Sequence, residues 1–138
     1  MKHKDVTDKI IGCFFTVYNE LGYGFLESVY ERAMMIELEK QGLRVACQYP
    51  IRVYYDGQVV GDFRADLLVE DRVVVELKAA PQLAIQHEAQ LLNYLNATGY
   101  EVGLLLNFGP QARFKRKIFD NERKCYRVPQ AAATRLNQ

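Results

Sequence analysis

Two neighbouring segments alternate apolar and charged residues, and they constrain the fold more than any other part of the chain. Residues 59–69 carry apolar side chains at Phe63, Ala65, Leu67 and Val69 and charged ones at Asp62, Arg64 and Asp66. Residues 73–78 read Val-Val-Val-Glu-Leu-Lys and follow after three polar residues. Because successive side chains of a strand point to opposite faces, this pattern predicts two antiparallel strands that share one apolar face.

The length of the connection decides which residues of the two strands face each other. A three-residue loop at residues 70–72 places Asp66 directly opposite Glu76, with Cα atoms about 5 Å apart. A two-residue loop would put the two carboxylates on opposite faces. Asp71 tolerates the left-handed conformation that a three-residue loop needs, and the apolar faces of both strands agree with the same register. We therefore expect Asp66, Glu76 and Lys78 on one face.

Two carboxylates and a lysine at strand ends are suited to phosphodiester chemistry. Adjacent carboxylates repel each other unless positive charge neutralises them. Lys78 supplies one positive charge, and Mg²⁺ or Mn²⁺, which prefers oxygen ligands, would supply more. Such a metal polarises a phosphate and lowers the pKa of a bound water, while Lys78 would orient that water or stabilise the developing negative charge. The alternative is a surface ion pair of Glu76 with Lys78 or Arg64.

Helical periodicity predicts three helices outside this hairpin. The first covers residues 8–21, with a buried stripe of Ile10, Phe14, Val17 and Leu21. The second covers residues 26–41. We expect its core face to consist of Val29, Ala33 and Ile36. A different face of this helix carries Glu27, Tyr30, Glu31 and Met34. The third covers residues 82–97. One apolar row consists of Ile85, Ala89 and Leu92, and a neighbouring one of Leu91 and Leu95. A polar stripe consists of Gln86, Gln90 and Tyr94.

Further strands complete the expected order α-α-β-β-β-α-β. Residues 43–55 form one strand or two, interrupted at Pro50, and the Asp-Gly pair at 56–57 predicts a hairpin turn. The continuous apolar run within residues 101–107 is typical of a central buried strand. Residues 114–119 and 125–128 are candidates for edge strands.

Composition bounds the class of protein. A chain of 138 residues with 49% hydrophobic and 25% charged residues predicts a single domain over residues 1–138, with a core at about 5–128 and a disordered tail at 131–138. No apolar run approaches the roughly 18 residues of a membrane span, and the polar start does not resemble a signal peptide. Cys13, Cys47 and Cys125 lack metal-ligand spacing and indicate reduced thiols in the cytoplasm.

A basic segment lies near the C-terminus. Residues 113–127 hold seven basic and two acidic residues, a net +5, although the whole chain is only +1. Local positive charge of this kind is compatible with a phosphate backbone. The candidate nucleic-acid contacts are Arg113, Lys115, Arg116 and Lys117. The alternative is a solvated strand and turn rich in lysine and arginine.

The order of elements, with an Asp followed by Glu-x-Lys, resembles the PD-(D/E)xK nuclease superfamily over roughly residues 5–120. More narrowly, residues 24–30, Gly-Phe-Leu-Glu-Ser-Val-Tyr, resemble the Gly-x-x-Glu-x-x-Tyr signature of the bacterial GxxExxY proteins. Residues 90–94, Gln-Leu-Leu-Asn-Tyr, resemble the Gln-x-x-x-Tyr motif of RecB-like nucleases. The chain departs from the name-giving pattern because Ala65, not proline, precedes Asp66.

This resemblance implies a restriction-endonuclease-like α/β fold, in which an α-β-β-β-α-β core forms a mixed central sheet flanked by helices. It also implies that Asp66, Glu76 and the main-chain carbonyl of Leu77 are metal ligands and that Lys78 is the catalytic lysine. Glu27 resembles an additional acidic residue of many members, and Gln90 and Tyr94 would lie beside the site.

The resulting functional expectation is a nuclease dependent on Mg²⁺ or Mn²⁺ that cleaves DNA in repair or defence. One alternative is a catalytically silent nucleic-acid-binding or protein-interaction module on the same scaffold, and another is a nuclease that acts on RNA. A minimal core of this size leaves little surface for sequence reading. We therefore also expect that specificity comes from a homodimer or a partner subunit.

Overall fold

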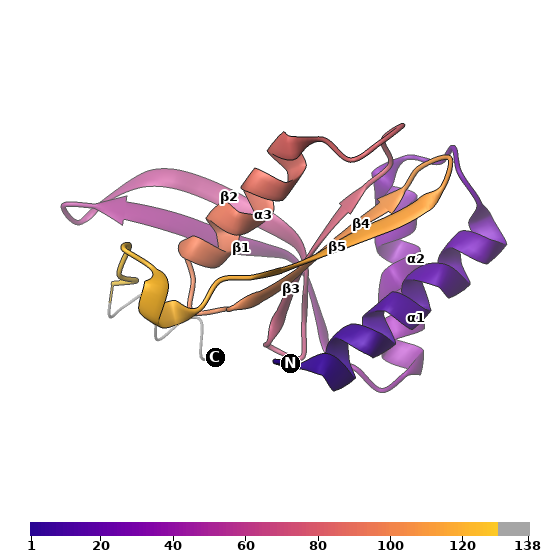
Figure 1. Cartoon of the computed structure of the whole chain (residues 1–138), viewed down its shortest axis with the longest axis horizontal. Helices are drawn as coiled ribbons and strands as arrows, with labels where there is room; N and C mark the ends of the chain where they lie inside the picture. The colour runs from indigo at the N-terminus through magenta and orange to yellow at the C-terminus, as the bar shows by residue number, and fades with distance from the viewer. Residues whose placement is uncertain (130–138) are drawn as a thin grey trace.

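A five-stranded mixed sheet forms the centre of the protein (Figure 1). The computed structural model describes residues 1–129, and the predicted disordered tail at 131–138 lies outside them. The strand order is β1-β2-β3-β4-β5, with β3 and β4 parallel and the other neighbours antiparallel. The elements are α1 Lys4–Leu21, α2 Glu27–Lys40, β1 Val45–Tyr55, β2 Gln58–Val69, β3 Val73–Lys78, α3 Ile85–Asn96, β4 Val102–Phe108, β5 Ala112–Ile118 and a 3₁₀ turn Asn121–Arg123.

The helices cover both faces of the sheet, so the protein has two apolar cores. α1 and α2 lie on one face and α3 on the other (Figure 1). Val73, Val75 and Leu77 of β3 pack in the cluster with α1 and α2, whereas Val74 packs in the cluster with α3. β4 is buried along its whole length, as its continuous apolar sequence predicts. This arrangement confirms the expected mixed α/β fold.

The β2–β3 register confirms the three-residue loop. Leu67 pairs with Val75, and Val69 pairs with Val73. Glu70 and Asp71 adopt left-handed φ values of 54° and 51°, as the short connection requires. Pro50 does not divide β1, because β1 is the edge strand of the sheet and an edge strand tolerates a residue without an N–H group.

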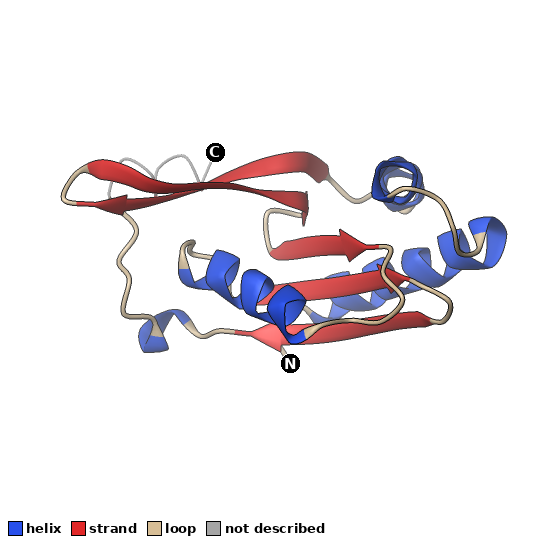
Figure 2. Ribbon diagram, turned by 90° about the horizontal axis from the view of Figure 1, so that it is seen from above, coloured by secondary structure: helices blue, strands red, loops and turns tan. Residues whose placement is uncertain are grey.

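The two strands of the β1–β2 hairpin change faces at one place. Leu67 and Val69 pack toward α1 and α2, but Ala65 packs toward α3, so the prediction of one continuous apolar face on residues 63–69 is wrong. Gln48, which lies between the pairs Cys47–Leu67 and Tyr49–Ala65, has a left-handed φ of 53°. This conformation redirects both strands, and the outer hairpin projects beyond the other strands (Figure 2).

The buried face of α2 also differs from the expectation. Tyr30, Met34 and Leu38 are fully buried, whereas Val29 and Ile36 are exposed. Both stripes of the helix carry apolar residues, so the pattern alone does not choose between them. Tyr30 decides the orientation, because its ring stacks on Phe108 of β4 with centroids 4.2 Å apart.

Three smaller expectations need correction. In α3 the buried residues are Leu91, Tyr94 and Leu95, while Ile85 is 84% exposed because it begins the helix outside the core. α1 begins at Lys4, four residues earlier than predicted. Residues 125–128 form no strand, because a 3₁₀ turn and a bend follow β5. None of the helices in residues 1–129 has the length and apolar character needed to cross a membrane.

Candidate functional site

The candidate site lies where β2 and β3 separate. Direct pairing of the two strands ends at Leu67 and Val75. Beyond that point two side chains bridge the strands. The Asp66 N–H donates to Glu76 Oε1 at 2.9 Å, and the Leu77 N–H donates to Asp66 Oδ2 at 2.8 Å. One oxygen of each carboxylate is therefore fixed by a backbone amide. The other oxygen of each can contact a further ligand, in the case of Asp66 Oδ1 beside its 3.5 Å contact with Gln48 Nε2.

Burial and mutual repulsion give both carboxyl groups an unusual protonation equilibrium. Glu76 is only 3% exposed, and burial, followed by the charge of Asp66, raises the pKa of Glu76 to about 8. Burial also raises the pKa of Asp66, and the nearby charges of Glu31 and Glu27 act in the same direction. Burial and the neighbouring carboxylates thus disfavour the ionised form of both groups.

Lys78 stands beside this pair without neutralising it directly. Its charge lowers the pKa of both Asp66 and Glu76, although burial outweighs that effect. Within residues 1–129, Lys78 forms no direct ion pair with any carboxylate, and Arg64 instead donates to the carbonyl of Gln48. The alternative of a surface ion pair is therefore wrong, because Glu76 is buried and pairs with neither cation.

Two residues that were not among the predicted site residues, Gln48 and Glu31, connect α2 to the carboxylate pair. Gln48 Nε2 donates to Glu31 Oε2 at 3.0 Å and reaches Asp66 Oδ1 at 3.5 Å. Cys47 Sγ donates to the other oxygen of Glu31 at 2.9 Å. Glu31 lies four residues after Glu27, and this spacing places two acidic side chains on one face of α2. That spacing is the sequence signal that could have identified Glu31.

The donor set fits a hard divalent ion. In the part of the chain that the structure describes, no three His, Cys, Asp or Glu side chains form a complete metal cluster. Asp66 and Glu76 nevertheless supply oxygen ligands at a point where positive charge is missing. Mg²⁺ is often held by only one or two carboxylates and completes its coordination with water and substrate phosphate. Asp66, Glu76 and the Leu77 carbonyl are the groups that would hold it.

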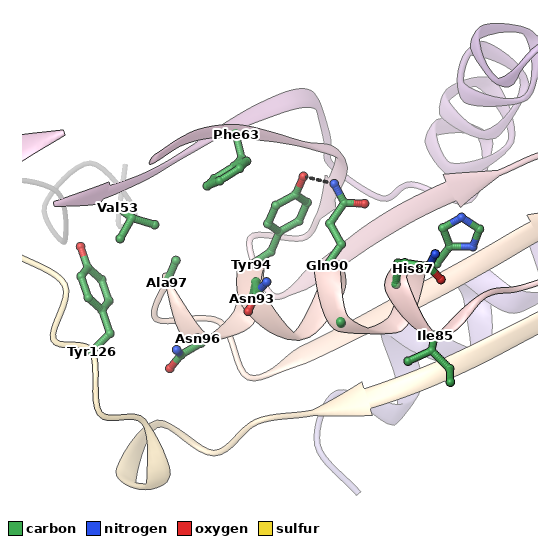
Figure 3. Close-up of a pocket in the computed structure, with 12 residues that line it drawn as sticks. Val53, Phe63, Ile85, His87, Gln90, Asn93, Tyr94, Asn96, Ala97 and Tyr126 are labelled. Atoms are coloured by element: carbon green, nitrogen blue, oxygen red, sulfur yellow. Dashed lines mark hydrogen bonds between the residues drawn. The ribbon is translucent and has the colours of Figure 1, made fainter. Parts of the chain in front are cut away.

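Gln90 and Tyr94 border the same site from α3. Gln90 Nε2 donates to the Tyr94 hydroxyl at 2.9 Å (Figure 3). Tyr94 is 4% exposed, and burial together with the charge of Glu76 raises its pKa to about 12. The charge of Glu76 therefore acts on the Tyr94 hydroxyl, and Gln90 is linked to the site through its hydrogen bond to Tyr94.

The four basic candidates on β5 do not form one patch. Strand alternation places Lys115 and Lys117 toward α3, where Lys117 forms an ion pair with Glu88 at 2.6 Å and both lysines lower the pKa of Glu88. Arg113 lies on the same face of β5 as these two lysines and donates a hydrogen bond to Gln111. Arg116 faces the opposite side and donates to the carbonyl of Lys2.

Comparison with known proteins agrees with this geometry. The profile of the PD-(D/E)XK nuclease superfamily matches residues 4–118, which is most of the chain. The protein belongs to the PD-(D/E)XK nuclease superfamily. It therefore carries a nuclease-type domain, and divalent metals and nucleic acid are the general cofactors and substrates of that superfamily.

A solved structure described as "Crystal structure of SSO0001" has the same fold, with a TM-score of 0.56 and 19% sequence identity. The match covers 80% of this PD-(D/E)XK chain and 55% of the other, so the present chain spans about half the length of that relative. The search of curated proteins gave no match.

Proposed function

We propose that the protein is a metal-dependent nuclease that hydrolyses phosphodiester bonds in DNA. The observation that carries this proposal is the pair Asp66 and Glu76, each fixed by a backbone amide in a buried fork, with Lys78 beside them. A protein that only binds nucleic acid gains nothing from carboxylates that repel phosphate. The whole chain would then act as one nuclease domain in DNA repair or defence.

Each residue has a distinct task in this proposal. Bound Mg²⁺ or Mn²⁺ would supply the Lewis acid and lower the pKa of the attacking water. Asp66, Glu76 and the Leu77 carbonyl would hold the ion, and Lys78 would orient the water and stabilise the charge that develops on the phosphate. Glu27 and Glu31 would add negative charge that favours a cation, while Gln90 and Tyr94 border the substrate side.

The structure also offers a reason for the Gly-x-x-Glu-x-x-Tyr segment. The Tyr30 hydroxyl donates to the carbonyl of Gly22 at 2.7 Å and accepts from the Phe25 N–H at 3.2 Å. Gly24 has a φ of 124°, which favours glycine. Tyr30 and Gly24 thereby fix the turn that presents Glu27 as the first residue of α2. This arrangement supports membership of the GxxExxY proteins.

A direct assay tests the proposed activity. Purified protein is incubated with labelled single- and double-stranded DNA and RNA, in the presence of Mg²⁺, Mn²⁺ or EDTA, beside an Asp66→Asn control. We expect metal-dependent cleavage of DNA that EDTA and Asp66→Asn abolish. Binding without cleavage under any metal would instead support the silent binding module, and cleavage of RNA alone would correct the substrate.

We expect the lysines on the α3 side of β5 to guide the phosphate backbone. Replacing Lys115 and Lys117 together with alanine should weaken DNA binding for all sequences alike. The logarithm of the binding constant falls linearly with the logarithm of the salt concentration, and the double substitution should reduce the steepness of this line by about 0.7–0.9 for each phosphate that is no longer neutralised. Arg116→Ala is the matched control, because Arg116 faces the other side of the sheet. Equal slopes for the wild type and the double variant would contradict this role.

Gln48 is expected to position Asp66. The Gln48→Gly variant lacks both side-chain hydrogen bonds but suits the left-handed φ of 53°. Its thermal stability should be unchanged or higher, because relief of about 1 kcal/mol of strain offsets the entropy cost of glycine. Cleavage should fall by about tenfold, as expected when one or two hydrogen bonds are removed. Gln48→Asn, which keeps an amide, should retain more activity, and full activity of the glycine variant would refute this role.

Two further proposals concern the setting of the protein. A homodimer or a partner subunit would supply the sequence specificity that the small core lacks. Sedimentation of the purified protein tests whether it forms a homodimer.

Exposed free thiols at Cys47 and Cys125 suit a reducing compartment such as the cytoplasm.

A further inference from the structure

A groove of about 960 Å³ separates the outer β1–β2 hairpin from α3. Val53 and Phe63 line it from the hairpin, Gln90 and Asn93 line it from α3, and Ala97 lines it directly after the end of α3 (Figure 3). Tyr126 closes one end, where its hydroxyl accepts a hydrogen bond from the Tyr54 N–H at 3.1 Å. The face change at Gln48 creates this groove, because it turns Phe63 of the projecting hairpin toward α3.

The lining combines apolar surface with neutral amides. Its residues include no Lys, Arg, Asp or Glu, and four of them are the amide side chains Gln86, Gln90, Asn93 and Asn96. Asn96 Oδ1 is buried without a hydrogen-bond partner from the described residues. Phe63 is 45% exposed and leans on Tyr94, with ring centroids 5.9 Å apart. These groups suit a planar ring that has polar edges, whereas a phosphate would require cations.

The groove borders the candidate site. Tyr94, which lines the groove, packs in the same apolar cluster as Ala65, the residue that precedes Asp66 on β2. A strand whose phosphate lies at the metal ligands could therefore place its neighbouring nucleotide in the groove. The bases of a duplex are stacked and paired, so a base enters such a groove only from an unpaired strand.

We propose that the groove receives bases of single-stranded DNA, with one base stacked on Phe63 and its edge bonded by the α3 amides. The inference rests on the proposed nuclease function and adds the class of substrate. Lys115 and Lys117, which face the same side of the sheet as α3, would lie near the backbone of the bound strand.

Binding measured without cleavage tests this proposal. Wild-type protein in EDTA is titrated into a fluorescently labelled single strand and into the duplex of the same sequence, and anisotropy is recorded. We expect tighter binding to the single strand. Phe63→Ala should weaken that binding by about tenfold or more, as removal of one stacking platform predicts, and should change duplex binding by less than about twofold.

Matched variants exclude unspecific effects. Tyr55→Ala removes an aromatic ring from the same hairpin that is 75% exposed and outside the groove, so it should leave binding unchanged. Phe63→Leu keeps an apolar side chain without an aromatic face and should lose most of the affinity that Phe63→Ala loses. Circular dichroism confirms that each variant is folded. A 2-aminopurine base in the strand should be quenched by wild-type protein and not by Phe63→Ala.

The outcomes separate this inference from the nuclease proposal. Cleavage of DNA with equal affinity for single strand and duplex, and no effect of Phe63→Ala, would overturn the groove and leave the nuclease. Binding of single strands that depends on Phe63, without cleavage under any metal, would support the groove and overturn the nuclease. Tighter binding of single-stranded RNA than of DNA would overturn the assignment to DNA.

Discussion

Replacing Lys78 with alanine should reduce DNA cleavage by at least about 100-fold while leaving most of the DNA binding intact. Lys78 stands beside the carboxylate pair without a direct ion pair to either, so its ammonium group is available for the charge that develops on the phosphate. Loss of one such stabilising group typically lowers the rate by about 10²–10³-fold. Binding of the ground-state substrate does not use this interaction, so it should change little. Cleavage rates under single-turnover conditions and anisotropy measure the two effects.

Lys117→Ala provides the contrast for this experiment. Lys117 lies on β5 and is separated from β3 by β4, so its removal should weaken binding and leave the single-turnover rate at saturation unchanged. If both variants lose binding and cleavage in the same proportion, Lys78 only contacts another phosphate, and its assigned role in the transition state is wrong.

The sequence was sufficient for the central part of the site because two simple rules overlap there. The period of two holds for residues 67–69 and 73–77, which share one apolar cluster, and together with the three-residue loop it allows one register, which places Asp66 opposite Glu76. The backbone bonds that each carboxylate accepts follow from this placement. Their roles as metal ligands stay predictions that the assays above test.

The change of face at Gln48 could not be predicted from the sequence. Glycine and asparagine are the residues that usually mark a left-handed conformation, and glutamine gives no such signal. The hairpin therefore reads as one regular strand pair, although its outer half turns toward α3. Glu31 was missed for a related reason, because its contact with the site passes through Gln48.

The choice of the buried face of α2 depends on tertiary contacts. Val29 and Ile36 form as plausible an apolar stripe as Tyr30, Met34 and Leu38. Tyr30 packs inside because its ring stacks on Phe108 while its hydroxyl bonds the backbone of the preceding turn. A tyrosine with a satisfied hydroxyl can be buried as fully as a leucine, and sequence periodicity does not contain that information.

The metal-free protein should lose stability as the pH rises from about 4.5 to about 8. Burial and the charge of Asp66 raise the pKa of Glu76 from 4.5 to about 8. Between these values the folded protein holds a proton on Glu76 that the unfolded chain has released. The folded state therefore binds more protons, and the free energy of unfolding falls with rising pH. At about 1.4 kcal/mol for each pKa unit, the loss is on the order of a few kcal/mol.

Glu76→Gln should remove most of this pH dependence. The neutral amide keeps the shape and can still accept the Asp66 N–H bond, so the variant should melt at a higher temperature than wild type at pH 8 and at a similar temperature at pH 5. Glu39→Gln removes one carboxylate from an exposed position of α2. It should change neither the melting temperature nor the dependence of the melting temperature on pH.

A divalent ion should bind the same carboxylate, and its stabilising effect should increase with rising pH. Mn²⁺ should stabilise wild-type protein more at pH 8 than at pH 5, because protons compete for the carboxylates at low pH. It should have little effect on Glu76→Gln. Thermal denaturation with and without Mn²⁺ at both pH values measures these differences. A wild-type stability that is independent of pH, with the same response to Mn²⁺ in the variant, would show that Glu76 neither holds the proton nor binds the ion.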